Sequence, residues 1–229
     1  MEDYPSLHEA VMTRIIMVRH GQSIANLDER FSGYSNFDLT ELGRSQAELA
    51  AKYLHGVMRE KVDKIYSSDL LRAHNTAVPF SELYGLPVND TEELREIYAG
   101  EWESLPFTEI MERYTDDHNV WINDFSNSRC TGGESTRELY RRIVAAVTKL
   151  ARENDGKAIL LASHATPIRA IDCFSHGWGE ERIGDVPFVK NTAISIFEYD
   201  PQTNTISAVL VGSTEHLDKD MTTALPKTI

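Results

Sequence analysis

Two short apolar runs that each lead directly into a histidine constrain the fold of this 229-residue chain most strongly. The first run covers residues 14–18 and leads to His20, and the second covers residues 158–162 and leads to His164. A short run without polar alternation is typical of a strand covered on both faces, as in a parallel sheet flanked by helices. Both histidines are therefore expected at the carboxyl ends of central strands, where open α/β sheets bind their ligands.

Helical and extended patterns alternate around these two runs. Apolar residues at helical spacing predict amphipathic helices over residues 39–57, 70–84 and 135–154. The third of these starts with Ser135 and Glu138 at the spacing of a capping box. Further strands are expected at residues 64–67, 194–199 and 206–211, with the last two forming a hairpin or a pair of edge strands. This order predicts a three-layer α/β/α fold with a mostly parallel, doubly wound sheet.

The length is compatible with one domain that spans residues 1–229. The periodic pattern breaks down over residues 97–133, which we interpret as a small helical insertion or lid with short helices at about 107–114 and 118–125. The tail, residues 213–229, is polar and expected to be loose.

The net charge of −13 argues against nucleic acid or an anionic membrane as a partner, because both would be repelled. An anionic substrate would need a local cluster of cations set against this acidic background. The start of the chain, up to Val11, lacks a signal-peptide pattern, and no window approaches eighteen consecutive apolar residues. Cys130 and Cys173 share no metal-binding or disulfide motif. We therefore expect a cytoplasmic protein without disulfides, for which a homodimer is one compatible assembly.

The segment around His20 carries several groups suited to phosphate. Arg19 offers a planar, permanently charged fork, Gly21 permits close backbone approach, and Ser23 and Asn26 add a hydroxyl and an amide. Arg72 follows the second predicted strand and begins a helix. Taken singly, a histidine at a strand end is more often structural than catalytic, and a lone helical arginine is more often solvated.

Six blocks in order along the chain make the pattern more specific. They are Arg19-His20-Gly21; Phe37-Asp-Leu-Thr-Glu-Leu-Gly43 with Gln46-Ala47; Ser67-Ser68 with Arg72-Ala73 and Thr76-Ala77; Leu94-Arg-Glu96 leading to Gly100-Glu-Trp-Glu103; Gly132-Gly-Glu-Ser135; and Ser163-His164 with Ile168-Arg169. Together they resemble the histidine phosphatase superfamily, in the branch of the cofactor-dependent phosphoglycerate mutases and their phosphatase relatives. The resemblance runs from about residue 13 to 211.

The resemblance implies that His20 is the nucleophile and that Arg19, Arg72 and His164 complete a phosphate pocket. It also implies that Asn26 assists phosphate binding and that Glu96 gives a proton to the leaving alcohol. Where the family commonly has glycine after its second histidine, this chain has Ala165, whose backbone N–H remains available to phosphate. This departure leaves the identity of the substrate open.

The chemistry of these groups supports the same roles. A neutral imidazole can attack phosphorus directly, so one displacement is divided into two through a phosphohistidine. Two arginines and a protonated second histidine can neutralise the phosphate charge, so neither metal nor cofactor is required. A carboxylic acid beside phosphate oxygens has a raised pKa and can protonate the leaving alkoxide. Glu101 and Glu103 lie close to Glu96 in sequence and remain alternative acids.

These residues predict a metal-independent phosphomonoester hydrolase acting on a small phosphorylated metabolite. One alternative is mutase-type phosphoryl transfer, for which the adjacent Arg141 and Arg142 would be cationic contacts if they were not solvated on their helix. Another alternative is a non-catalytic member that binds phospholigands or proteins. The aromatic side chains of the insertion would either line an apolar wall beside the phosphate or form a satellite core; they are Trp102, Phe107, Tyr114, Trp121 and Phe125.

Overall fold

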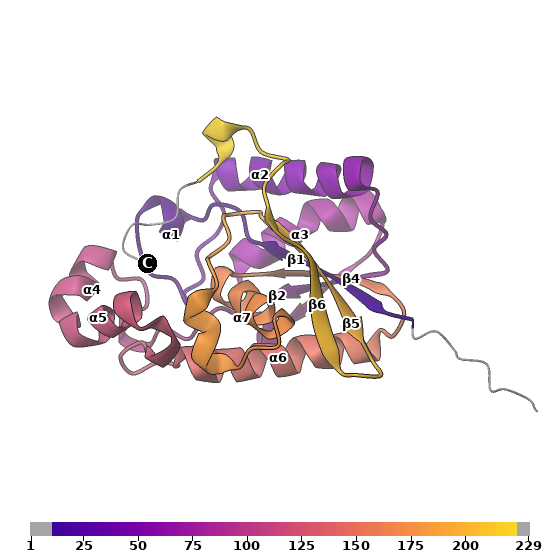
Figure 1. Cartoon of the computed structure of the whole chain (residues 1–229). Coiled ribbons are helices and arrows are strands. Elements are labelled where there is room, and N and C mark those ends of the chain that lie inside the picture. The colour runs from indigo at the N-terminus through magenta and orange to yellow at the C-terminus, as the bar shows by residue number, and fades with distance from the viewer. Residues whose placement is uncertain (1–10, 224–229) are drawn as a thin grey trace, which may run out of the picture.

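A six-stranded, mostly parallel sheet forms the centre of the computed structural model, which describes residues 11–223 (Figure 1). The strands are β1 (Thr13–Arg19), β2 (Lys64–Ser68), β3 (Val88–Thr91), β4 (Ala158–Ser163), β5 (Ile194–Asp200) and β6 (Thr205–Ser213). Their order across the sheet is β3-β2-β4-β1-β5-β6. Strands β1 to β4 are parallel, whereas β5 runs antiparallel to β1 and pairs with β6 as the predicted hairpin.

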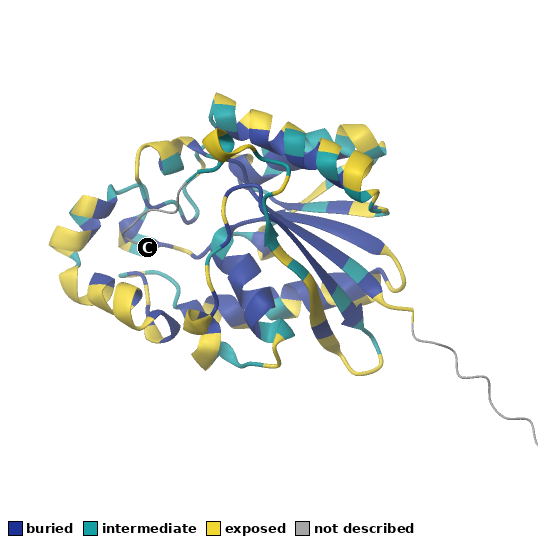
Figure 2. Ribbon diagram, turned by 45° about the horizontal axis from the view of Figure 1, so that its top comes forward, coloured by how far each residue is buried: buried dark blue, intermediate teal, exposed yellow. Residues whose placement is uncertain are grey.

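Helices cover both faces of this sheet, which confirms the three-layer α/β/α prediction (Figure 1). Helices α2 (Glu41–Lys52) and α3 (Leu71–Tyr84) lie on one face, and α6 (Thr136–Glu153) and α7 (Ala165–Ser175) lie on the other. Side chains of a strand alternate between the faces, so Ile16 packs with α2 and α3 while Ile15 packs with α6 and α7. Figure 2 shows the consequence: the central strands are buried and the outer helix surfaces are exposed.

Some elements depart from the sequence prediction for identifiable reasons. The helix expected at residues 39–57 is α2 extended by a π-helical turn, Tyr53–Met58. Helix α7 is not predicted by periodicity, because all its residues from Thr166 to Cys173 are buried and no polar face alternates with an apolar one. The short helix α1 (Ile24–Leu27) and the short strand β3 also escape the sequence pattern.

The insertion contains two short helices, α4 (Phe107–Arg113) and α5 (Thr115–Asn123), flanked by 3-10 turns at Gly100–Trp102 and Phe125–Asn127. The helical pieces are therefore close to those predicted, although α5 begins three residues earlier. Edge-to-face aromatic contacts join this region to Phe31, whose ring centroid lies 5.5 Å from that of Trp102 and 5.3 Å from that of Trp121. These rings belong to the core on the α6–α7 side of the sheet, so the buried side chains of the insertion extend that core while the outer surfaces of α4 and α5 are exposed.

The segment after β6, expected to be loose, is attached to the fold at residues 214–223. It contains a 3-10 turn at Lys219–Met221, and the Met221 carbonyl accepts a hydrogen bond of 2.7 Å from the Gln46 side chain. The Tyr53 hydroxyl donates to Glu215 at 2.6 Å, and the Thr223 hydroxyl donates to Asn191 at 2.7 Å. Residues 224–229 of the predicted tail lie outside the described residues, as does the chain start at 1–10.

Both cysteines, Cys130 and Cys173, are buried free thiols. Across residues 11–223, none of the helices combines the length and apolar character needed to cross a membrane.

Candidate active site

The two histidines predicted at strand ends meet at one edge of the sheet. Strands β1 and β4 are direct neighbours, and their register pairs Arg19 with Ser163. The backbone N–H of His20 continues this ladder by donating to the Ser163 carbonyl at 2.9 Å. As a result the His20 and His164 rings lie edge to face, with centroids 5.2 Å apart.

The His20 ring is oriented by its own loop. Its Nδ1 lies 2.7 Å from the Gly21 carbonyl oxygen, a contact that requires Nδ1 to carry the proton, because a carbonyl oxygen can only accept. The lone pair is then on Nε2, which has no hydrogen-bond partner within residues 11–223. Burial, with the nearby charges of Arg72 and Arg19, holds the pKa of His20 well below 6.5. The ring is therefore neutral and nucleophilic at neutral pH.

Arg19 and Arg72 bring two buried guanidinium groups to the histidines. Arg19 donates to the Val189 carbonyl at 2.6 Å, and Arg72 donates to three loop carbonyls, those of Ser32, Gly33 and Ser35, at 2.8–3.0 Å. In both arginines Nε is buried and has no partner among the described residues. Burial lowers the pKa of each to about 10, so both remain cationic at neutral pH.

His164, whose ring lies next to that of His20, is the N-cap residue of α7 and is fully buried. Its Nε2 is 2.9 Å from the Ser68 hydroxyl, and its Nδ1 has no partner in the described part of the chain. The sequence predicts that this imidazole is protonated. Among the protein's own groups, burial and the charge of Arg72 hold the pKa of His164 well below 6.5, which favours the neutral imidazole; its protonation beside a phosphate stays a prediction.

Glu96 is the acidic side chain that reaches this site. One carboxylate oxygen accepts from the Ile97 N–H at 2.9 Å and the other accepts from the Thr166 N–H at 3.3 Å, at the start of α7. Burial raises the pKa of the Glu96 carboxyl above 4.5. Of the two alternative acids, Glu103 accepts hydrogen bonds from the backbone of residues 34, 35 and 99, and Glu101 is exposed.

Several of these groups line one cavity. The residues that line it are the ones available to a ligand. Five of the predicted residues line it: Arg19, His20, Asn26, Glu96 and Ala165. Arg72 and His164 do not line it; both are fully buried, each with an unpartnered buried nitrogen among residues 11–223. The remaining wall is largely apolar and comes from Phe31, Ile97, Phe107, Trp121 and Phe188, with Arg30, Ser32 and Thr166 as polar members.

Two residues predicted to contact substrate have structural roles instead. Ser23 caps α1, accepting from the Asn26 N–H at 3.2 Å, and its hydroxyl donates to the Asn26 side chain at 3.1 Å. The Gly21 N–H donates to the Thr76 hydroxyl at 3.0 Å, and a Cβ on Gly21 would lie only 2.3 Å from the Gly43 carbonyl oxygen. The hydroxyl and the glycine therefore shape the loop, and neither lines the cavity.

Sequence reasoning missed a second set of residues that hold the His20 loop. The Asn191 side chain donates to the His20 carbonyl at 2.9 Å and to the Asn26 side chain at 3.2 Å. Thr192 has a positive φ of 52° and donates its N–H to the Arg19 carbonyl at 3.1 Å. Both residues precede β5, far away in sequence, and no local motif indicates that they belong to the site.

The fold and this arrangement agree with a comparison against known families. Residues 15–211 match the histidine phosphatase superfamily (branch 1). The chain therefore belongs to the histidine phosphatase superfamily. The predicted family, fold and phosphatase type of enzyme are confirmed.

Individual relatives are phosphatases by name. The chain is 33% identical over 162 residues to phosphoserine phosphatase 1 of Hydrogenobacter thermophilus, covering 71% of this chain and 75% of that protein. It is 31% identical to the adenosylcobalamin/alpha-ribazole phosphatase of Escherichia coli, covering 66% and 73%. A solved mycobacterial glucosyl-3-phosphoglycerate phosphatase superposes with a TM-score of 0.79 at 27% identity, covering 89% of this chain and all of that one. Some mycobacterial relatives are longer, and the chain spans 43% of their length.

Proposed function

We propose that this protein hydrolyses small phosphomonoesters by transferring the phosphoryl group to Nε2 of His20. The observation that carries the proposal is the contact between His20 Nδ1 and the Gly21 carbonyl, because it leaves the lone pair on Nε2. In the first step the Nε2 lone pair forms a bond to phosphorus as the ester P–O bond breaks. Arg19 and Arg72 stabilise the negative charge that spreads over the phosphoryl oxygens.

Glu96 protonates the leaving alcohol in this step. Its raised pKa favours the protonated form, and its place in the wall of the cavity puts it within the same space as His20. In the second step, Glu96 accepts a proton from water as the water oxygen attacks phosphorus and the P–N bond breaks. Inorganic phosphate, neutral His20 and protonated Glu96 are regenerated.

Hydrolysis is favoured over mutase-type transfer by the surroundings of the two adjacent arginines. Arg141 is exposed and forms an ion pair with Glu180, while Arg142 forms an ion pair with Glu134. Neither side chain lines the cavity. Apart from Arg19, which we assign to the phosphate, Arg30 is the one cationic side chain among residues 11–223 that lines the cavity. Few contacts are therefore available to hold a second phosphate or a carboxylate.

The aromatic wall supports a leaving alcohol with an apolar surface. Phe107 and Trp121 contribute to this wall from the insertion and also pack in the core, so both roles considered for the insertion aromatics describe them. Trp102 and Phe125 are buried in the core and do not line the cavity.

A phosphoenzyme experiment tests the proposal. The protein is mixed with a ³²P-labelled phosphomonoester, quenched at alkaline pH, where phosphohistidine survives, and counted, beside an assay of phosphate release. Wild type is expected to incorporate label and release phosphate, and His20→Ala is expected to do neither. Label retained in His20→Ala would overturn the nucleophile, and interconversion of phosphoglycerates faster than phosphate release would overturn the hydrolase.

A further inference from the structure

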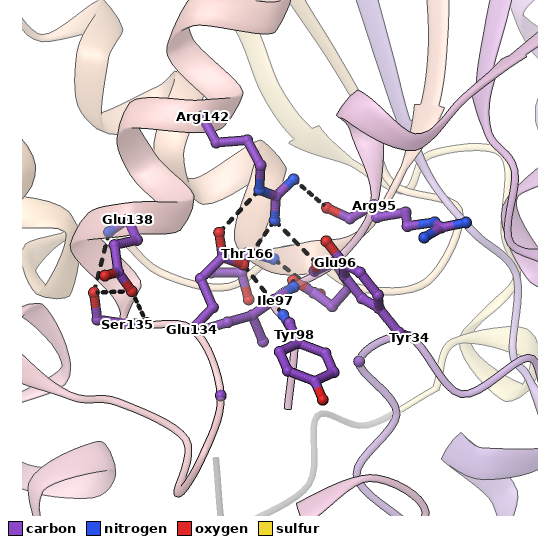
Figure 3. Close-up of polar contacts among 12 residues, drawn as sticks. Tyr34, Arg95, Glu96, Ile97, Tyr98, Glu134, Ser135, Glu138, Arg142 and Thr166 are labelled. Carbon is purple, nitrogen blue, oxygen red and sulfur yellow. Dashed lines mark hydrogen bonds and ion pairs between the residues drawn. The ribbon is translucent and has the colours of Figure 1, made fainter. Parts of the chain in front are cut away.

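Arg142 makes a set of contacts that the reaction described above does not use. Its guanidinium, on α6, forms an ion pair with Glu134 in which both donor nitrogens lie 2.9 Å from the carboxylate oxygens (Figure 3). The same group donates to the backbone carbonyls of Arg95 at 3.0 Å and Glu96 at 3.1 Å. An arginine fork suits this arrangement, because its nitrogens point in several fixed directions at once.

Glu134 holds the backbone on the other side of Glu96, at Tyr98. Its carboxylate accepts from the Tyr98 N–H at 3.1 Å, and its own N–H donates to the Tyr98 carbonyl at 2.8 Å. The preceding Gly133 allows this approach, since a Cβ there would lie 2.4 Å from the Tyr98 carbonyl oxygen. The Gly132-Gly133-Glu134-Ser135 block of the sequence is therefore packed directly against residues 98–100.

The chain that carries Glu96 needs such external support. It lies between two 3-10 turns, Glu92–Leu94 and Gly100–Trp102, and has no regular secondary structure of its own. The hydrogen bonds that orient the Glu96 carboxylate come from the N–H groups of Ile97 and Thr166. Their geometry depends on where the backbone of residues 95–98 sits, which is the part held by Arg142 and Glu134.

We propose that the Arg142–Glu134 ion pair is a positioning device for the general acid, holding the backbone on both sides of Glu96. Arg142 does not touch the cavity, so it acts through Glu96 and contributes nothing to phosphate binding. The proposal rests on the proposed role of Glu96 as the acid. Because displacement of a catalytic group by about 1 Å costs about 10²-fold in rate, a modest loosening of this segment is measurable.

The test compares two substrates that differ in their need for an acid. A nitrophenyl phosphate expels a stable phenolate without protonation, whereas glycerol 2-phosphate expels an alkoxide that needs a proton. We measure kcat/KM, which reports steps up to phosphoenzyme formation, for wild type and Arg142→Gln. Arg142→Gln is expected to lose about 10- to 100-fold toward glycerol 2-phosphate and less than about 3-fold toward the nitrophenyl ester.

The adjacent Arg141 provides a matched control. It lies on the same helix and forms an ion pair with Glu180, but on the exposed surface and away from residues 95–98. Arg141→Gln is therefore expected to leave both substrates within about 2-fold of wild type. Thermal unfolding of both variants shows whether they are folded, and Arg142→Lys, which retains the charge without the fork, is expected to recover only part of the loss.

A double-mutant cycle separates positioning from general destabilisation. If Arg142 acts through Glu96, adding Arg142→Gln to Glu96→Gln costs no further activity toward glycerol 2-phosphate. Equal losses on both substrates, or additive losses in the double variant, would overturn the positioning role while leaving Glu96 as the acid. If Glu96→Gln itself shows no preference between the substrates, the proposed acid is wrong and the positioning role fails with it.

Discussion

Replacing Gly43 by alanine is expected to disturb both the stability and the activity of the enzyme. Gly43 lies in the first turn of α2, and an alanine Cβ would be 2.1 Å from the Gln22 carbonyl oxygen and 2.9 Å from the Gln22 N. Ordinary contact begins at 3.4 Å, so one of the two backbones must move by about 1 Å. Gln22 cannot move freely, because its N–H donates to Gln46 at 2.8 Å and its carbonyl accepts from Thr40 at 2.9 Å.

The size of the effect follows from this clash. Overpacking of this kind costs about 1–3 kcal/mol in the free energy of unfolding. In a chain of this length each kcal/mol corresponds to about 2–4 °C, so Tm is expected to fall by about 2–12 °C. Gln22 is two residues from His20, and a shift of about 1 Å in the nucleophile corresponds to about 10²-fold in kcat/KM.

Gly56 supplies the control for this experiment. It lies in the π-helical turn after α2, and an added Cβ would meet nothing within 4 Å. Gly56→Ala is therefore expected to stabilise the fold by about 0.4–1 kcal/mol through the unfolded chain, with unchanged activity. Thermal melts and kcat/KM with a nitrophenyl phosphate measure both variants. A Gly43→Ala protein that matches Gly56→Ala in Tm and activity would refute the reasoning.

Three further outcomes are expected. Because burial raises the pKa of Glu96, the folded state binds more protons than the unfolded one above pH 4.5, so stability falls as pH rises through the folded pKa. Glu96→Gln should then melt at a higher temperature than wild type at pH 8, with the difference vanishing towards pH 4.5; a constant difference would contradict this. Phe188→Ala should raise KM about tenfold for naphthyl phosphate, a loss of about 1.4 kcal/mol of apolar contact, and leave glycerol 2-phosphate nearly unaffected. Incubation with EDTA should leave kcat unchanged, because Arg19 and Arg72 supply the positive charge; lost activity restored by added metal would argue against that role.

The sheet and most of its helices could be predicted because their signals are local. The runs at residues 14–18 and 158–162 are apolar since both faces of β1 and β4 are covered, and this pattern is visible without any partner. Helix α6 is equally visible, with its capping box at Ser135 and its apolar stripe. Helix α7 was not predictable in this way, because a helix buried on nearly all sides has no polar face to reveal its period.

The same distinction between local and distant signals applies to the residues of the candidate site. His20, His164 and Glu96 could be predicted as candidates because each stands in a recognisable block of sequence, and the structure places His20 beside His164 and in the same cavity wall as Glu96. Asn191, which holds the His20 carbonyl, was missed because it approaches from a distant loop before β5. The tertiary structure also shows what the sequence could not, that burial beside Arg72 lowers the pKa of the His164 imidazole.

The sequence by itself determined most of the strands and helices, with α1, α7 and β3 as exceptions, together with the residue types available for chemistry and the acidic background around a few cations. These depend on composition and on periods of two to four residues, which packing does not alter. Only the tertiary structure decided that Glu96, and not Glu101 or Glu103, faces the cavity, and that Arg142 is committed to the backbone beside Glu96. Such assignments depend on which distant segments meet, because pKa values and hydrogen-bond partners are set by neighbours in space.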